Sequence, residues 1–338
     1  MTVVELAANQ PADRFYAGGA RIRAFRGAAA EGDHVPEDWV GSVTPLFGER
    51  DLGLTRLPDG WLLRDAVAAD PVAWLGEDHV RRFGSDTALL VKLLDAGERL
   101  PVHAHPDREF AAAHLGLAHG KTEAWIALEP ADVHLAFARD VSDDELAGWV
   151  QHQDTAAMLG AMHTLRLRAG DAVLVPAGLP HAIGEGAFVV ELQEPTDLSI
   201  LMEWDGFRID GAALGHLGLG FGTALAAVDR RAWSADEVEA LRGADASTVG
   251  PLLPAAAEFF RADRSRGPVS WDPGFAVVVI VAGQGALRPD DGSVVPLRPG
   301  QTLLVPHSAG AVEVSGAADL ELLRCRPPAA AVGGVTAR

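Results

Sequence analysis

Short apolar runs separated by glycine, proline and aspartate are the dominant pattern along the chain. The stretches 88–94, 123–128, 172–175 and 187–192 are rich in alanine, valine and leucine, and turn-forming residues bound each of them. Runs of this length with turns at both ends are typical of β-strands. The longest run, 275–282, is too short to cross a bilayer and is expected to be a buried strand. The pattern therefore predicts an all-β sandwich or barrel rather than alternating strands and helices.

Two stretches of the chain carry the signals that begin helices. Ser142 with Glu145, and Ser234 with Glu237, have the serine-to-glutamate spacing of a capping box. Leucine, tryptophan, valine and methionine residues follow the first pair and suit an amphipathic helix. We therefore expect a helical insert at about 140–164 and a shorter helix that begins after Ser234.

A short segment of the chain recurs much later. Gly-Asp-Ala-Val-Leu-Val-Pro at 170–176 returns as Gly-Gln-Thr-Leu-Leu-Val-Pro at 300–306. Each copy is a glycine, a polar residue, a strand and a proline, and the copies are far enough apart to lie in separate β-domains. The sequence therefore predicts two related β-barrels: a first barrel with the helical insert over 1–215, a helical linker over 216–249 and a second barrel over 250–338.

Composition and charge narrow the classes of partner. Hydrophobic residues make up 48% of the 338 positions and charged residues 22%, so a sizeable core can form. The net charge of −19 repels phosphate backbones and anionic lipids, so we expect neither nucleic acid nor a membrane as a partner. The single cysteine, Cys325, excludes a disulfide framework and a thiolate metal cluster. The first residues do not resemble a signal peptide, and the expected location is the cytoplasm.

Lysine is rare in this chain. The 28 basic residues include only two lysines, Lys92 and Lys121, and all the others are arginines. Where arginine serves as the general surface cation, a retained lysine indicates that the chemistry of a primary amine is required rather than charge alone. Both lysines are therefore candidates for a functional site.

The segment around His103 carries the strongest chemical signal. His103 and His105 are two residues apart, so in a strand their side chains face the same side. Glu123 lies in a later predicted strand, and His181 follows a proline- and glycine-rich turn after the first copy of the repeat. Three imidazoles and one carboxylate suit zinc, manganese, iron or nickel and leave coordination positions open. The second copy has Ala311 where the first has His181, so the second barrel is expected to hold no metal.

The order of these motifs resembles the type I phosphomannose isomerase family of the cupin superfamily. The glycine-bounded histidine pair and the later histidine match the two cupin motifs, and the resemblance covers about residues 35–210, with a looser continuation beyond. The segments that carry it are 92–95, 105–107, 120–125 and 176–184. The resemblance implies a mainly β fold of two cupin-type barrels, or jelly rolls, and a metal-dependent interconversion of an aldose phosphate and its ketose.

The resemblance also implies a set of site residues. One divalent metal, most often Zn²⁺ with Mn²⁺, Fe²⁺ or Co²⁺ as alternatives, is expected on His103, His105, Glu123 and His181. The implied catalytic residues are Lys121, Glu191 and Asp197, and Arg208 is added as a catalytic candidate because of its position in the sequence. The implied substrate-binding residues are Lys92 and Trp125. The expected partner is a small sugar or sugar phosphate, and the expected assembly is a monomer or homodimer.

The chain departs from the family pattern at three positions. The family usually has glutamine at the first ligand position, where this chain has His103. A family arginine falls on Leu201, for which the nearby Arg208 either compensates or is merely a surface residue. A family serine that helps to hold the substrate phosphate falls on Pro101, which has neither a hydroxyl nor an N–H group. Two alternatives therefore stay open: the substrate is a non-phosphorylated sugar, or other residues hold its phosphate.

The expected function is a metal-dependent aldose–ketose isomerase resembling mannose-6-phosphate isomerase. It would convert mannose or mannose 6-phosphate to fructose or fructose 6-phosphate by proton transfer between C1 and C2 through an enediol, with Glu191 or Lys121 as the general base. One alternative is a cupin metal dioxygenase, against which the Gly-Lys-Thr-Glu-Ala-Trp motif counts. The other is a sugar-binding cupin without turnover, which the change at Leu201 favours and the retained ligands oppose.

Overall fold

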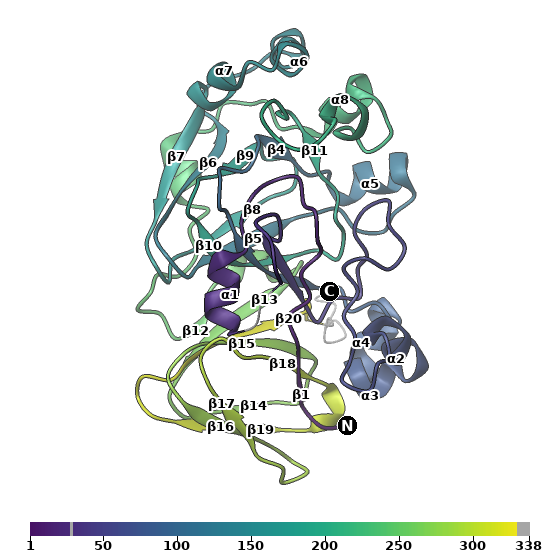
Figure 1. The fold of residues 1–338 in the computed structure, drawn as a ribbon, viewed down its shortest axis with the longest axis vertical. Coiled ribbons are helices and arrows are strands. Elements are labelled where there is room, and N and C mark those ends of the chain that lie inside the picture. The colour runs from purple at the N-terminus through teal and green to yellow at the C-terminus, as the bar shows by residue number, and fades with distance from the viewer. Residues whose placement is uncertain (28–29, 330–338) are drawn as a thin grey trace, which may run out of the picture.

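Antiparallel β-strands dominate the structure, as the sequence predicts (Figure 1). The computed structural model describes residues 1–27 and 30–329. The strands form four antiparallel sheets that pack in two pairs, which we call the first and second sandwich. Within the described residues, no helix is both long enough and apolar enough to span a bilayer.

The first sandwich consists of two five-stranded sheets. One sheet has the order β2 (Glu37–Val40), β3 (Leu90–Asp95), β10 (Phe188–Gln193), β5 (Glu123–Ala127) and β8 (Ala172–Val175). The facing sheet has the order β11 (Ile200–Leu201), β4 (His103–Ala104), β9 (His181–Ile183), β6 (Ala131–Phe137) and β7 (Met162–Leu167). Apolar side chains of both sheets meet in one core between them.

The second sandwich consists of a six-stranded and a four-stranded sheet. The larger sheet has the order β1 (Val4–Glu5), β18 (Thr302–Val305), β15 (Ala276–Ala282), β20 (Glu321–Arg326), β13 (Arg261–Arg266) and β12 (Gly250–Pro251). The smaller sheet has the order β14 (Val269–Trp271), β19 (Val312–Gly316), β16 (Gly285–Pro289) and β17 (Val295–Leu297). The first and last sheet strands of the chain therefore lie in the same sandwich.

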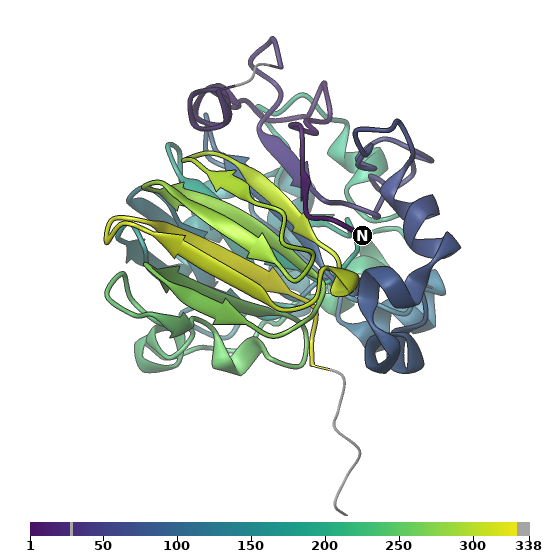
Figure 2. The ribbon, with the colours of Figure 1, turned by 90° about the horizontal axis from the view of Figure 1, so that it is seen from below.

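Short helices lie around the sheets. Figure 2 looks toward the strands of the second sandwich, with the blue helices α2 to α4 beside them, and α3 contacts the 3₁₀ turn His307–Ala309. The helices described up to residue 160 are α1 (Ala20–Arg26), α2 (Leu63–Ala69), α3 (Pro71–Leu75), α4 (Glu77–Phe83), α5 (Arg108–Leu115), α6 (Asp143–His152) and α7 (Thr155–Gly160). The later helices are α8 (Gly211–Leu214), α9 (Phe221–Ala224) and α10 (Ala235–Glu239).

The predicted helix starts agree with the structure. The Ser142 side chain accepts a hydrogen bond from the backbone N–H of Glu145 at the start of α6. Ser234 and Glu237 form the full reciprocal capping box at the start of α10. Each cap satisfies amide donors that have no partner within the helix, so the local sequence is sufficient to fix where these helices begin.

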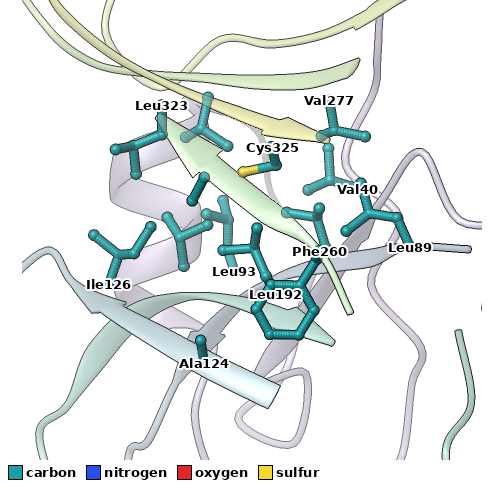
Figure 3. Packing of buried hydrophobic residues seen from close by; sticks show 14 of the residues in the cluster. Val40, Leu89, Leu93, Ala124, Ile126, Leu192, Phe260, Val277, Leu323 and Cys325 are labelled. Atoms are coloured by element: carbon teal, nitrogen blue, oxygen red, sulfur yellow. The ribbon is translucent and has the colours of Figure 1, made fainter. Parts of the chain in front are cut away.

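The two sandwiches pack against each other through a continuous apolar seam (Figure 3). Alternate residues of each strand face opposite sides of a sheet, so Leu93 and Leu192 enter the seam while their neighbours face the first sandwich. From the second sandwich, Val277, Leu323 and Cys325 enter the same seam. Burial raises the pKa of the Cys325 thiol. The seam therefore joins the sheet that carries site residues to the larger sheet of the second sandwich.

The structure does not establish the predicted closed barrels or the predicted boundaries between them. Among the described residues, no strand pairing joins the two sheets of either sandwich into a closed barrel. Strand β1 pairs with β18, so the N-terminal strand adds to the second sandwich. The boundaries 1–215, 216–249 and 250–338 stay predictions, and residues 330–338 of the last unit lie outside the described residues.

Packing in the seam generates a stability prediction. Replacing Leu323, which is fully buried, by alanine should lower the free energy of unfolding by about 2–5 kcal/mol, because a cavity would replace well-packed contacts. Urea-induced unfolding would measure the change. The exposed Leu52 provides a control, since Leu52→Ala should change stability by less than about 0.5 kcal/mol. Equal effects of the two substitutions would contradict the packing described for the seam.

Candidate functional site

Three buried histidines converge at one end of the first sandwich. Strand β4 and its extension supply His103 and His105, and β9, which pairs with β4, supplies His181. His103 and His181 are direct cross-strand partners. One ring nitrogen from each of the three histidines lies within 4.8 Å of the others. The pairing of β4 with β9 thus brings together histidines that are far apart in the sequence.

Backbone carbonyl groups fix the tautomer of each imidazole. The Nδ1 atom of His103 lies 2.8 Å from the carbonyl oxygen of Pro101, and that of His181 lies 2.8 Å from the carbonyl of Leu179. The Nδ1 atom of His105 lies 2.6 Å from the carbonyl oxygen of Leu198. A carbonyl can only accept, so each Nδ1 must carry the proton and donate it. Each Nε2 atom then keeps its lone pair, as a metal ligand requires.

Glu123 reaches the histidines from the facing sheet. Its Oε2 atom lies 3.1 Å from Nε2 of His105, and its Oε1 atom lies 3.4 Å from Nε2 of His181. The indole N–H of Trp125 donates to Oε1 at 3.0 Å, and Nζ of Lys121 lies 3.1 Å from Oε2. The carboxylate is therefore held in place by its own strand and aimed at the imidazoles.

The donor atoms at this point fit a divalent metal. Nε2 of His105 and Nε2 of His181 are buried and have no hydrogen-bond partner among the described residues, and they face Oε2 of Glu123, which has an ion pair with Lys121. A buried polar atom without a partner costs about 1–3 kcal/mol, so two imidazole nitrogens together at one point require compensation. A metal ion would satisfy both of them at once. Three imidazole nitrogens and one carboxylate form a donor set suited to zinc and similar ions.

The protonation states agree with this role. Burial, assisted by the positive charge of Lys121, outweighs the opposing effect of Glu123 and lowers the pKa of His105 and of His181 to about 3. Burial raises the pKa of Glu123, but the charge of Lys121 and the contact with His105 outweigh burial and hold that pKa well below its usual range. At neutral pH the imidazoles are uncharged and the carboxylate is ionised, which is the form that binds metal.

A cavity of about 370 Å³ opens beside the histidines and contains a buried lysine. Nζ of Lys92 lies 3.6 Å from Oε1 of Glu191, 3.6 Å from Oδ1 of Asp197 and 3.8 Å from Oε2 of Glu37. It also lies 4.4 Å from the ring centroid of Trp39. Burial would lower the pKa of Lys92, but the three carboxyl groups outweigh burial and raise it to about 12. Lys92 is therefore a permanent cation at the base of the cavity.

Glu191 is a carboxyl group whose pKa is raised toward neutrality. It lies on β10 directly opposite Lys92 of β3. Burial, followed by the negative charge of Glu123, raises the pKa of Glu191 to about 7, although Lys92 and Lys121 act in the opposite direction. A carboxyl group with a pKa near the operating pH can both take up and release a proton, which suits general acid–base catalysis.

The structure brings most of the predicted site residues together at this cavity. Its walls include six of them: Lys92, His103, Lys121, Glu123, Glu191 and Asp197. His105 and His181 lie behind His103, within ring contact of it. The Trp125 side chain is buried behind Glu123, outside the cavity wall. Arg208 is exposed and does not line the cavity.

Among the titratable residues of the cavity wall, sequence reasoning missed Arg14, Tyr16 and Glu37. Nη2 of Arg14 lies 3.5 Å from Oε1 of Glu37, to which the hydroxyl of Tyr16 donates. The indole N–H of Trp39 donates to the other oxygen of Glu37 at 2.6 Å. Only the fact that Tyr16 is the single tyrosine of the chain distinguishes it in the sequence. These residues belong to N-terminal segments without a local motif, so only the fold places them here.

Comparisons with known proteins give a consistent result. A family model described as phosphomannose isomerase type I, catalytic domain, matches residues 35–139. Mannose-6-phosphate isomerase from Streptococcus mutans is 29% identical over 186 residues, which are 53% of this chain and 54% of that protein. Among solved structures, mannose 6-phosphate isomerase from Bacillus subtilis has a TM-score of 0.74 at 20% identity, over 96% of this chain and 100% of that chain. A variant of phosphomannose isomerase from Salmonella typhimurium has a TM-score of 0.72 at 18% identity, over 97% and 100% of the two chains.

These matches confirm the resemblance that the motifs predicted. The chain spans about half the length of the curated relatives it matches. The sequence identity between this chain and the two solved structures is too low to show more than a common fold. The fold is therefore of the phosphomannose isomerase kind, and the histidine triad is placed so that it could hold a metal.

Metal binding can be tested by removing single ligands. The variants His181→Ala and Glu123→Gln should each retain well under half of the zinc that the wild-type protein keeps after dialysis, because each loses one of four donor groups. Elemental analysis would give the metal content per chain. His152→Ala, at an exposed histidine of α6, is the matched control and should bind zinc as wild type does. Full zinc content in both ligand variants would remove these residues from the site.

The metal-free protein should lose stability as the pH falls from 7 to 5. His105 and His181 stay uncharged in the folded state but bind protons when unfolded, so the unfolded state takes up more protons below pH 6.5. Each should contribute roughly 1 kcal/mol per pH unit to this loss. Chelator-treated His181→Gln should show a shallower dependence of unfolding free energy on pH than chelator-treated wild type or His152→Gln. Parallel curves for all three proteins would contradict these protonation states.

Proposed function

We propose, from the resemblance of this chain to the type I phosphomannose isomerase family, that it is a metal-dependent aldose–ketose isomerase. The reaction would be that of a mannose-6-phosphate isomerase: mannose or mannose 6-phosphate to fructose or fructose 6-phosphate. The observation that carries the proposal is the convergence of three histidines and Glu123 beside a cavity that also contains Glu191 and Lys121. No single motif in the sequence would support it as strongly.

The proposal includes a finer account of the fold. Each sandwich would be a cupin-type barrel, the first over 1–215 with the helical insert, the second over 250–338 without metal, and 216–249 would be a linker. The distribution of chemical groups supports this account, because His103, His105 and His181 all lie in the first sandwich. The ligands proposed for the metal are these three histidines and Glu123, and zinc is the expected ion, with Mn²⁺, Fe²⁺ or Co²⁺ as alternatives.

The reaction requires a proton to move between C1 and C2 of the sugar. A divalent ion on the histidines would stabilise negative charge on the substrate oxygens as that proton moves. Glu191 lines the same cavity, and its pKa of about 7 allows it to remove the proton from one carbon and return it to the next. Glu191 is therefore our preferred general base.

Each of the two lysines would interact with carboxyl groups in the cavity. Lys121 lies 3.1 Å from Glu123 and would keep that carboxylate ionised while its ammonium group donates to a substrate oxygen. Lys92 lies 3.6 Å from both Glu191 and Asp197, so Asp197 would act by holding Lys92 in position. Arg208 has no part in this mechanism because its side chain is exposed and outside the cavity wall.

Replacing Glu191 by glutamine should lower kcat at least about 100-fold, because the amide cannot accept the carbon-bound proton. Lys121→Ala should have an effect of similar size. The assay is incorporation of deuterium at C1 and C2 of mannose, fructose and their 6-phosphates in deuterated water. Metal content should stay near the wild-type value in Glu191→Gln, since Glu191 is not a proposed ligand.

Glu185→Gln provides the matched control, because Glu185 is exposed and close to Glu191 in the sequence. It should exchange deuterium at the wild-type rate. Near wild-type turnover in Glu191→Gln would remove this residue from the mechanism. Absence of exchange by metal-replete wild type with every sugar would overturn the isomerase proposal and favour a sugar-binding protein.

A further inference from the structure

The described cations that line the cavity are paired with carboxyl groups before any substrate enters. Of the described residues that line it, three are cations and four carry carboxyl groups: Arg14, Lys92, Lys121, Glu37, Glu123, Glu191 and Asp197. Each cation lies within 4 Å of at least one of these carboxyl groups. A metal ion bound by Glu123 would share the carboxyl partner of Lys121, whereas Arg14 and Lys92 would keep their own carboxyl partners. A phosphate group away from the histidines and Lys121 would therefore meet no unpaired cation among the described residues that line the cavity.

The solvent-exposed residues among the described lining, Phe47, Gly48 and Leu214, form the mouth of the cavity and include no cation that could replace the missing phosphate donors. Its apolar lining includes Leu46, Phe47, Ile209, Leu214 and Leu217. Pro101 and Leu201, at the positions where the resemblance implies a serine and an arginine, also line the cavity. Recognition of a phosphate normally needs several charge-assisted donors, such as arginine, lysine or helix N–H groups. Apolar walls provide none of these.

We infer that the substrate of this cavity is an uncharged sugar rather than a sugar phosphate. The inference rests on the proposed isomerase function and narrows its substrate class. Two observations carry it together: cations already paired with carboxylates, and a cavity mouth without a cation. The reacting carbons of the sugar would lie between the histidines and Glu191, and its remaining hydroxyls would extend toward the mouth.

The test compares matched sugar pairs on the metal-replete protein. Mannose, glucose and fructose are each measured against their own 6-phosphates, by deuterium exchange at C1 and C2 and by titration calorimetry. We expect kcat/KM and affinity to favour the uncharged member by at least about tenfold, a difference that loss of one or two charge-assisted bonds can produce. Equal or greater activity with the phosphates would overturn the inference and leave the isomerase proposal intact.

If no sugar is turned over, the binding measurements distinguish the isomerase proposal from the inference about an uncharged substrate. If no sugar exchanges deuterium but the uncharged sugars bind more tightly than their phosphates, the isomerase proposal fails and the inference about the ligand stands. If the phosphates bind more tightly, the inference fails whether or not exchange occurs. If no sugar of the panel binds or exchanges, both proposals fail.

A cation installed at the mouth gives a second test. Leu214 lines the cavity but is 64% exposed, so Leu214→Arg should fold normally. It should shift the ratio of kcat/KM values toward the phosphorylated sugars by about fivefold or more, because one charge-assisted bond is gained. Leu117→Arg, at an exposed leucine outside the cavity wall, is the matched control and should leave the ratio unchanged. The same ratio in both variants would contradict the role given to the apolar mouth.

Discussion

Strand register in one sheet is the constraint on which both the core and the cavity depend. Pairing of β2, β3, β10 and β5 aligns Trp39, Lys92, Glu191 and Trp125 in a single row across the sheet. The neighbours of these residues along each strand face the seam between the sandwiches. A slip of one residue in β3 would turn Lys92 into that seam and Leu93 toward the histidines. Burying an unpaired ammonium group is costly, so the polar row and the apolar row together select one register.

Burying the charged residues of this sheet lowers the stability of the folded protein. Lys92, Glu37 and Glu191 are each almost fully buried, and removing charges from water costs free energy that their mutual attraction offsets only partly. The opposite face of the sheet compensates with apolar burial against the second sandwich. We therefore regard the second sandwich as a stabilising backing for the sheet that carries the charged row, whatever other function it has.

Local patterns predicted the parts of this protein that depend on local physics. Short apolar runs bounded by turn residues predicted the strands, and serine and glutamate spacing predicted two helix starts. The rarity of lysine singled out Lys92 and Lys121, both of which line the cavity. Arg14 and Glu37 could not be found in this way, because only tertiary packing brings the N-terminal segment to the cavity. Arg208 shows the converse: it is close to Leu201 in sequence, yet its side chain points to solvent. Proximity along the chain is a poor guide where the backbone turns at a sheet edge.

The position of Cys325 gives the molecule a built-in reporter. Its thiol lies in the seam, fully shielded from solvent, and its raised pKa keeps it in the unreactive protonated form. A thiol reagent can reach it only when the larger sheet of the second sandwich separates from the first or unfolds. No other cysteine competes for the reagent. The rate of alkylation therefore measures how often the larger sheet of the second sandwich separates from the first sandwich or unfolds, without any introduced label.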